Sequence, residues 1–309
     1  MRQYLWVLLA LAALLLISSC NSSSDNGLLS LSLTDAPVDG ATNVVVDITA
    51  IQAIPQNGSP ITYTFSQPQQ VDLLQLQQGV STPLLNDWSL PPGQYIGLNL
   101  FVSADPSAPD SYIVLDNGNQ YPLVPLQPVN STSCGLPCAN TAELSVNTPF
   151  NISSNENDAY VIDFDARKSV LPPSNPGSTQ YLLQPEGRMA AILSSGNILG
   201  IVPNSLITPG CTPAVYAFVG ANATPTDINN SAPSATQPLT EMAVTLNNNT
   251  GDYVFTAAFL PAGEYTLGFT CEAAQDNPNT ADNINFTFTG SVPVAAQTTF
   301  RVVLTNPNS

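Results

Sequence analysis

Apolar and polar residues alternate one by one over much of the chain. In residues 28–34, Leu29, Leu31 and Leu33 fall on one face of an extended strand, and Val44, Val46 and Ile48 do the same in residues 43–51. A period of two, over short runs bounded by Pro, Gly and Asn, predicts half-buried β-strands. Similar runs occur near residues 92–103, 110–115, 159–165, 187–193, 197–203, 213–219, 240–247, 252–259, 263–272, 283–289 and 297–304.

The same pattern predicts the fold class. The stretch 71–79 is compatible with a strand end or a helical turn, and no amphipathic helix of useful length is predicted after residue 20. Short strands at this spacing predict antiparallel β-sandwiches or barrels. We expect an all-β protein with antiparallel sandwiches of the Ig-like or prealbumin-like kind.

One segment nearly repeats itself. LPPGQYIGLNL at residues 90–100 matches LPAGEYTLGFT at residues 260–270, with Pro and Gly forming a turn and a tyrosine starting the next strand. We expect Tyr95 and Tyr265 to pack against their turns, as tyrosines at sandwich corners do. Two such units predict two sandwich domains, 28–194 and 195–309, with the break at the polar turn 194–197. A linker this short predicts domains that touch.

The N-terminus has the features of an export signal. One positive charge at Arg2 precedes an apolar run from Tyr4 to Ile17, which is shorter than the ~20 residues a membrane-spanning helix needs. The run ends in Ile-Ser-Ser-Cys at Cys20, which resembles the bacterial lipobox, so we expect residues 1–19 to be removed and Cys20 to be lipidated. Residues 20–27 then form a polar, flexible tether. Asn21, in place of Asp, favours the outer membrane, facing the periplasm or the surface, if the host is Gram-negative.

Composition excludes several functions. The chain has 22 acidic residues, five basic residues and no histidine, for a net charge of −17. Such a chain repels nucleic acid, and it has no Ser-His-Asp or Cys-His catalysis and no histidine-based zinc site. Carboxylate-only catalysis, as in glycosidases, stays open. The acidic surface fits an exported, well-solvated protein.

The cysteine count fits this interpretation. Lipidation of Cys20 leaves four of the five cysteines for disulfide bonds. Local pairing joins Cys134 to Cys138 and Cys211 to Cys271, whereas the two crossed pairings would tie the two domains together. We favour the local set over a metal or redox role for the CGLPC segment.

The first domain resembles a known family. Residues 31–53 open the similarity, residues 71–79 and 90–100 follow, and YVIDFDARKSV at 160–170 with YLLQPEGRM at 181–189 closes it. These segments resemble the bacterial lipoprotein family called domain of unknown function 4382, over about residues 28–193. The resemblance implies an exported, often lipidated all-β protein without an assigned activity. The second domain resembles carboxypeptidase regulatory-like or transthyretin-like sandwiches, which bind or brace.

Four carboxylates form a candidate calcium site. Asp35 and Asp39 lie in a Pro- and Gly-containing turn, and Asp163 and Asp165 alternate with core positions and therefore face the non-core side of their strand. Calcium prefers 6–8 oxygen ligands, which such residues could supply. The alternative, which we favour, is that the first pair caps its turn and the second pairs with Arg167 or Arg188. No other metal or cofactor is predicted.

The expected function is binding or structural support. Trp88, the one tryptophan after the leader, could stack on a sugar, although a ring beside a corner turn more often packs. The sequence predicts a non-enzymatic protein, anchored to the membrane through its N-terminal lipid, with an envelope protein or a glycan as partner. The alternatives are a carboxylate-dependent hydrolase of envelope or extracellular polysaccharide and a subunit of a surface assembly.

Overall fold

The computed structural model describes residues 25–38, 40–107, 110–129, 140–173, 175 and 178–304. Within these ranges the protein is all-β, as predicted, with strands β1 to β21 and only short helical turns. Those turns are η1 (Leu73–Leu76), α3 (Ala166–Ser169), η2 (Ile192–Ser194), η3 (Asn204–Leu206), η4 (Ser234–Thr236) and η5 (Ala273–Gln275). No helix in the described ranges is long and apolar enough to span a bilayer.

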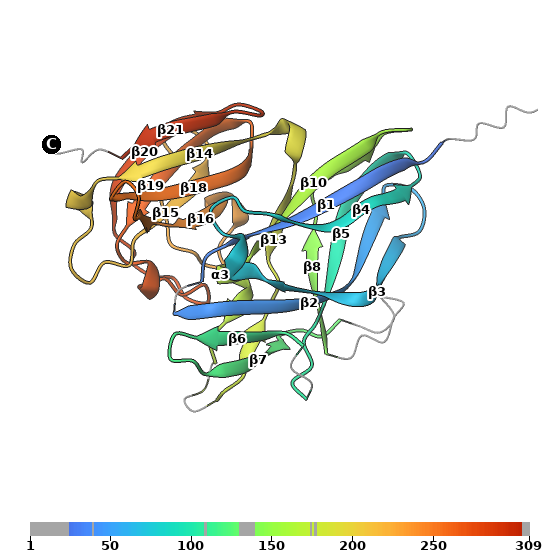
Figure 1. Ribbon diagram of the computed structural model, residues 1–309, viewed down its shortest axis with the longest axis horizontal. Coiled ribbons are helices and arrows are strands. Elements are labelled where there is room, and N and C mark those ends of the chain that lie inside the picture. The colour runs from blue at the N-terminus through green and yellow to red at the C-terminus, as the bar shows by residue number, and fades with distance from the viewer. Residues whose placement is uncertain are drawn as a thin grey trace, which may run out of the picture.

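The N-terminal half is built from two sheets (Figure 1). The first has the order β13 (Gly187–Ala191), β10 (Asn157–Asp165), β1 (Gly27–Ala36) and β4 (Thr82–Leu90). The second has the order β11 (Val170–Leu171), β12 (Tyr181–Leu183), β7 (Gln120–Pro125), β6 (Tyr112–Leu115), β2 (Ala41–Pro55), β5 (Gly93–Ser103) and β8 (Thr141–Val146), with β3 (Ile61–Asp72) beside β2 and β9 (Phe150–Ile152) beside β5.

The alternating residues form the core between these sheets. Leu29, Leu31 and Leu33 of β1 and Val44 and Val46 of β2 are all buried in one apolar cluster, so the predicted core faces are confirmed. The segment 71–79 contains both predicted features, because β3 ends at Asp72 and η1 follows it.

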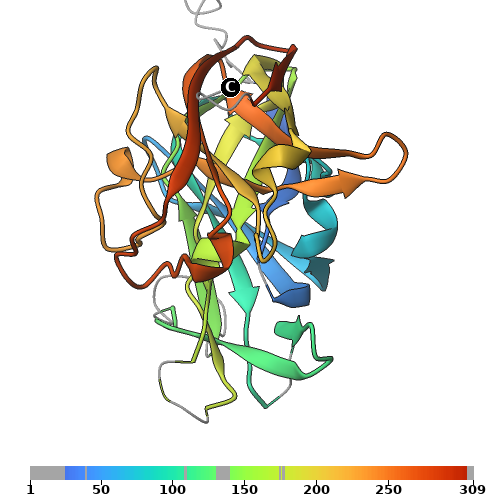
Figure 2. The same ribbon diagram turned by 90° about the vertical axis from the view of Figure 1, so that its left-hand side faces the viewer.

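The C-terminal half also has two sheets and a core of its own. The orders are β17 (Thr245–Asn247), β18 (Asp252–Pro261), β14 (Ser195–Val202), β21 (Thr299–Val303) and β16 (Thr240–Ala243), β15 (Ala214–Val219), β19 (Gly263–Thr270), β20 (Phe286–Val294). In Figure 2 this half faces the viewer, seen from the side that lies away from the N-terminal half. No sheet among the described strands mixes those before Ala191 with those after Ser195.

Strand pairing differs from the prediction in one respect. Most pairs are antiparallel, but β1 lies parallel to β10, β12 to β7 and β14 to β21. A parallel pair needs a connection that crosses over, and local alternation says nothing about which distant strand is the neighbour.

Both repeated segments form tyrosine corners. The Tyr95 hydroxyl donates to the carbonyl oxygen of Pro91 at 2.8 Å, and the Tyr265 hydroxyl donates to that of Pro261 at 2.7 Å. Each tyrosine is buried and binds back over four residues to its own turn. The predicted packing of both tyrosines is therefore confirmed.

Candidate functional site

The sequence-predicted residues fall into three groups. Cys20, Asp39, Cys134 and Cys138 lie outside the described residues. Cys211 and Cys271 form the predicted disulfide bond, with an S–S distance of 1.97 Å. Asp35, Asp163 and Asp165 lie where the two halves meet, and they define the site described next.

Asp163 and Asp165 are buried, with 6% of each residue exposed. The predicted core face of this strand is confirmed, because Ile162 and Phe164 are buried in the N-terminal core. The non-core side of this strand is nevertheless buried, because the C-terminal half packs against it. We call the residues Asp35, Asp163, Asp165, Arg167, Lys168, Arg188 and Glu241 the charged junction.

Arg188 connects the two halves at one edge of the charged junction. It lies opposite Asp163 in the β10–β13 pair, and its Nη2 is 2.7 Å from Asp163 Oδ2. The same guanidinium donates to the carbonyl oxygens of Phe259, at 2.8 Å, and Ala258, at 3.2 Å, both on β18 of the C-terminal half. The predicted pairing of Asp163 with Arg188 is confirmed, and the pair reaches across the junction.

The two carbonyl groups that accept hydrogen bonds from Arg188 lie in an irregular stretch of β18. Phe259 has φ = 53°, which a bulky L-residue seldom adopts, and the β14–β18 register shifts between Gly196 and Ile198. The Asn197 side chain accepts a hydrogen bond from the Phe259 N–H at 3.1 Å. A bulge changes the direction of the backbone, and here it points two successive carbonyl groups at one guanidinium. The left-handed backbone conformation costs on the order of 1–3 kcal/mol.

Lys168 occupies the centre of the charged junction. Asp165 caps the α3 turn by accepting from the Lys168 N–H at 3.0 Å, and the Lys168 Nζ lies 2.8 Å from the same carboxylate. Nζ also donates to the Pro238 carbonyl at 3.1 Å, and the Asn230 side chain donates to the Lys168 carbonyl at 3.0 Å. The partner of Asp165 is therefore Lys168 and not Arg167, because the strand ends there in a helical turn.

Arg167 and Glu241 complete the charged junction. Arg167 donates to the Ala273 carbonyl at 2.9 Å, and its Nε is 3.9 Å from Glu241 Oε1. Lys168 Nζ is 3.8 Å from the other oxygen of Glu241, whose side chain is 0% exposed. All three basic residues of the N-terminal half after the leader thus contact the C-terminal half.

Burial and neighbouring charges shift the pKa values of the residues in the charged junction. Burial raises the pKa of Glu241 well above its usual value, and the neighbouring Asp165 carboxylate raises it further. Despite burial, Lys168 lowers the pKa of Asp165. Despite burial, the Asp165 and Glu241 carboxylates raise the pKa of Lys168. Burial also raises the pKa of Asp163, and Arg188 opposes that rise.

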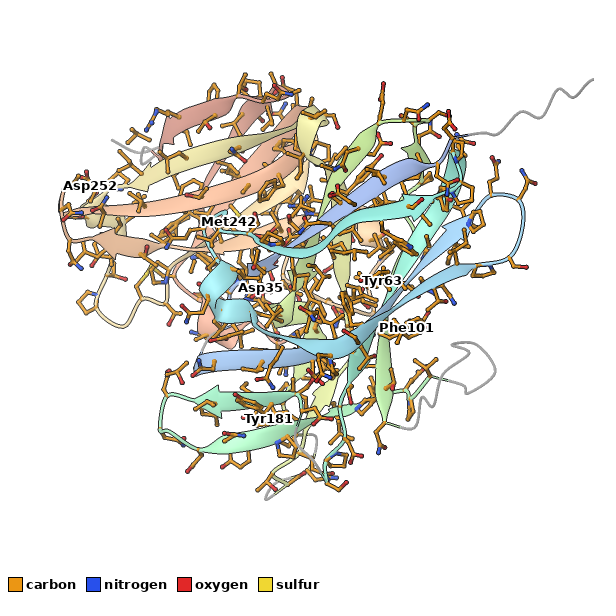
Figure 3. All side chains as sticks on the ribbon, turned by 45° about the vertical axis from the view of Figure 1, so that its right-hand side comes forward. Asp35, Tyr63, Phe101, Tyr181, Met242 and Asp252 are labelled. Carbon is orange, nitrogen blue, oxygen red and sulfur yellow. A yellow bond between two sulfur atoms is a disulfide. The ribbon has the colours of Figure 1, made fainter. Side chains whose placement is uncertain are left out.

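Asp35 lies at the end of β1, against β16 of the C-terminal half. Figure 3 shows it close to Met242, and both residues line a small pocket of about 20 Å³ together with Asp163 and Glu241. The Asp35 carboxylate accepts from the Ala166 N–H at 3.0 Å. This bond joins Asp35 to α3, 131 residues away, and is not the local turn cap of the alternative to calcium. Of that alternative, the pairing of Asp163 with Arg188 is confirmed, whereas Asp165 pairs with Lys168. Calcium binding by these residues stays a prediction.

A wider cleft of about 250 Å³ opens beside the charged junction. The ion pairs of Asp163 and Asp165 line it together with Glu186, and amide side chains including Asn229 and Gln237 line its other wall. Its chemistry is that of hydrogen bonding to a polar ligand.

A second group of carboxylates lies on one side of the C-terminal half. One oxygen from each of Asp227, Asp276 and Asp282 lies within 4.8 Å of the others. Asp276 accepts from the Tyr216 hydroxyl at 2.6 Å and from the Ile228 N–H at 3.1 Å. Asp227 Oδ2 accepts from the Asp282 N–H at 2.5 Å. No sequence pattern indicated this group, because its three residues lie in loops and are brought together only by the fold.

Trp88 packs as the favoured interpretation predicted. Its half-buried ring makes an edge contact with Tyr63, with ring centroids 5.8 Å apart, and lies against the N-terminal core. It is not a free platform for a sugar.

The two sandwiches and the charged junction between them define an all-β protein, the fold class expected from the sequence. A family model described as "Domain of unknown function (DUF4382)" matches residues 26–185. The chain belongs to this family, so that resemblance is confirmed. The segment YVIDFDARKSV, which carried the resemblance, is the one that forms most of the charged junction.

Known proteins and structures give little beyond this family. No curated protein matches the chain. Solved structures with some similarity include the Bacillus anthracis TIE protein, at 11% identity and TM-score 0.20, over 90% of this chain and 33% of that one. Others are the fimbrial anchor protein Mfa2 from Porphyromonas gingivalis, at 10% identity, TM-score 0.19 and 85% and 81% coverage, and the pilus backbone protein RrgB from Streptococcus pneumoniae, at 8% identity, TM-score 0.18 and 87% and 90% coverage. We draw no conclusion about function from similarities this low.

Proposed function

We propose that this chain is a lipid-anchored, non-catalytic envelope module that holds two β-sandwiches in a fixed arrangement and presents them to an envelope protein or glycan. The charged junction carries the proposal. Three of the four basic residues that follow Cys20 join one half to the other, and two of them, Lys168 and Arg188, pair with Asp165 and Asp163, which the sequence offered for chemistry. The resemblance of the C-terminal half to carboxypeptidase regulatory-like sandwiches belongs to this proposal.

The course of β1 supports an anchor at Cys20. β1 begins at Gly27, at the end of the N-terminal half remote from the C-terminal half, and runs toward the charged junction (Figure 1). An anchor a few residues before Gly27 holds the N-terminal half near the membrane and the C-terminal half away from it. Two or more acyl chains on one cysteine bind a bilayer firmly, whereas a single chain does not.

The hydrolase alternative needs an acid and a base that face one substrate. In a glycosidase the two carboxyl groups are separated by roughly 5–10 Å, and one must be ready to exchange its proton. Asp163 and Asp165 face the cleft, but each is bound to a cation of the same half. Such ion pairs occupy both carboxylates with partners of their own, which weighs against this function.

The anchor is tested by expressing the full chain and Cys20→Ala in a Gram-negative host. We expect the native protein in the outer-membrane fraction, with an intact mass raised by acyl groups on Cys20, and we expect the variant to lose both properties. A native protein without the acyl mass, or a variant still bound to membranes, contradicts the anchor.

The binding role needs a separate test. Cross-linking in intact envelopes, followed by a glycan array with the purified protein, identifies a protein or a glycan partner. Asp163→Asn and Asp165→Asn are the matched variants for a hydrolase assay on envelope polysaccharide. Turnover by the native protein that both variants lose would overturn the non-catalytic proposal.

A further inference from the structure

The charges of the charged junction do not balance if every group is ionised. Four carboxylates, Asp35, Asp163, Asp165 and Glu241, meet three cations, Arg167, Lys168 and Arg188. Each of these seven residues is buried or nearly so, so water screens little of the excess charge. Among these seven described residues, negative charges therefore exceed positive charges by one.

Glu241 is the group whose surroundings least suit an ionised carboxylate. Its side chain is 0% exposed, and the two cations beside it lie 3.8 and 3.9 Å away, beyond hydrogen-bond distance. Neither of its oxygens accepts a hydrogen bond from any of the residues that the structure describes. A buried carboxylate that lacks donors costs several kcal/mol to maintain.

Protonation removes both problems. As an acid, Glu241 gains one donor, and the Asp165 carboxylate beside it is the acceptor. Asp165 is itself fixed by the Lys168 ammonium and the Lys168 N–H. With one proton bound, three carboxylates face three cations. The pocket beside Glu241, at about 20 Å³, has room for one water molecule and none for a hydrated metal ion.

The groups around Glu241 come from several elements. Asp165 is the last residue of β10, and Arg167 and Lys168 follow it in α3. The ion pair of Asp163 and Arg188 belongs to β10 and β13. Asp35 on β1 lines the same pocket, and Tyr216 on β15 is directly opposite Glu241 in the sheet. Tyr216 bonds Asp276, so it does not serve Glu241 as a donor.

We propose that the charged junction is a proton-dependent clasp, in which Glu241 carries a buried proton that it shares with Asp165 and that lets the two halves dock. Loss of this proton places an unbalanced charge between the halves and weakens their docking. The clasp regulates how firmly the C-terminal half is held, and it does not depend on the lipid anchor or on any ligand.

The sign of the pH effect follows from linkage. The pKa of Glu241 is raised in the folded protein, so its stabilising contribution is complete below the ordinary pKa of glutamate, 4.5, and is lost as the pH rises through the raised value. Asp165 acts in the opposite sense, because its pKa is lowered, and its contribution is lost only as the pH falls below 3.8 toward the lowered value. Docking is therefore firmest in mild acid.

The test compares the native full chain with Glu241→Gln, which keeps the shape of the side chain without its charge. Urea unfolding is followed between pH 5 and pH 9. Within the window in which folded Glu241 keeps a proton that the unfolded chain has lost, the unfolding constant of the native protein should rise about tenfold more per pH unit than that of the variant. The matched control is Glu264→Gln, an exposed acid on β19, which should follow the native curve.

A second measurement identifies the proton directly. The infrared spectrum of the native protein in neutral buffer should contain the carbonyl band of a protonated carboxylic acid, and Glu241→Gln should lack that band. Parallel pH curves for the native protein and Glu241→Gln, or no such band in the native spectrum, overturn the proposal. Stabilisation by calcium that requires Glu241 also overturns it, because a metal ion would then balance the charge. The anchor and partner experiments use other residues, so their failure leaves this result unaffected.

Discussion

Removal of Arg188 should weaken both the β10–β13 pair and the contact between the two halves. In Arg188→Met the aliphatic part of the side chain remains, but Asp163 loses the donor at 2.7 Å and two carbonyls of β18 lose donors at 2.8 and 3.2 Å. Only 8% of the Asp163 side chain is exposed, so its carboxylate would lose its ion partner while still largely buried. Breaking one side of a buried ion pair costs about 3–5 kcal/mol of the free energy of unfolding.

The assay is urea unfolding at neutral pH, with Arg301→Met as the matched control. Arg301 lies on the exposed strand β21, so its removal should change stability by less than about 0.5 kcal/mol. The double variant Asp163→Asn/Arg188→Met leaves no unpaired buried charge and should recover about 1–3 kcal/mol relative to the sum of the single variants. An Arg188→Met cost below about 1 kcal/mol, or strict additivity in the double variant, would refute the reasoning.

Two further predictions concern features that the sequence already indicated. Tyr95→Phe and Tyr265→Phe each remove one hydrogen bond to a turn carbonyl, and each should lower the free energy of unfolding by about 1 kcal/mol in the same assay. The control Tyr253→Phe removes a hydroxyl without such a bond and should be nearly neutral. Equal effects in all three variants would contradict the corner role. The disulfide joins residues 60 apart, so Cys211→Ala/Cys271→Ala should lower the free energy of unfolding by about 4 kcal/mol, and an unchanged unfolding midpoint would show that the bond does not constrain the unfolded chain.

Local patterns predicted the elements of this fold well. Period-two alternation identified β1 and β2 and their core faces, because a strand with one buried face needs that pattern whatever its neighbours are. The twin Pro-Gly-Tyr segments predicted both tyrosine corners, since the turn and its hydrogen bond are local. Seven strands were missed, namely β3, β4, β7, β8, β9, β11 and β12. Three of them, β9, β11 and β12, have only two or three residues, which carry no measurable period.

The charged junction could not be predicted in full, because it depends on which strands of the other half cover β10. Alternation placed Asp163 and Asp165 on the non-core face, and that inference holds for their own sandwich. Only the three-dimensional arrangement shows that β16 and β18 lie over this face. The sequence signal was the cluster of two acidic and two basic residues at 163–168, in a chain that has few basic residues. Glu241 is distant in the sequence, so no local pattern connects it to this cluster.

Residual dipolar couplings of the folded full chain, measured separately for the amides of residues 27–191 and 195–303, test the central claim most directly. Two halves fixed by the charged junction should fit one common alignment tensor in mild acid, and Arg188→Met should require two. Separate tensors for the native protein, with each half still folded, would contradict the account of a single braced module.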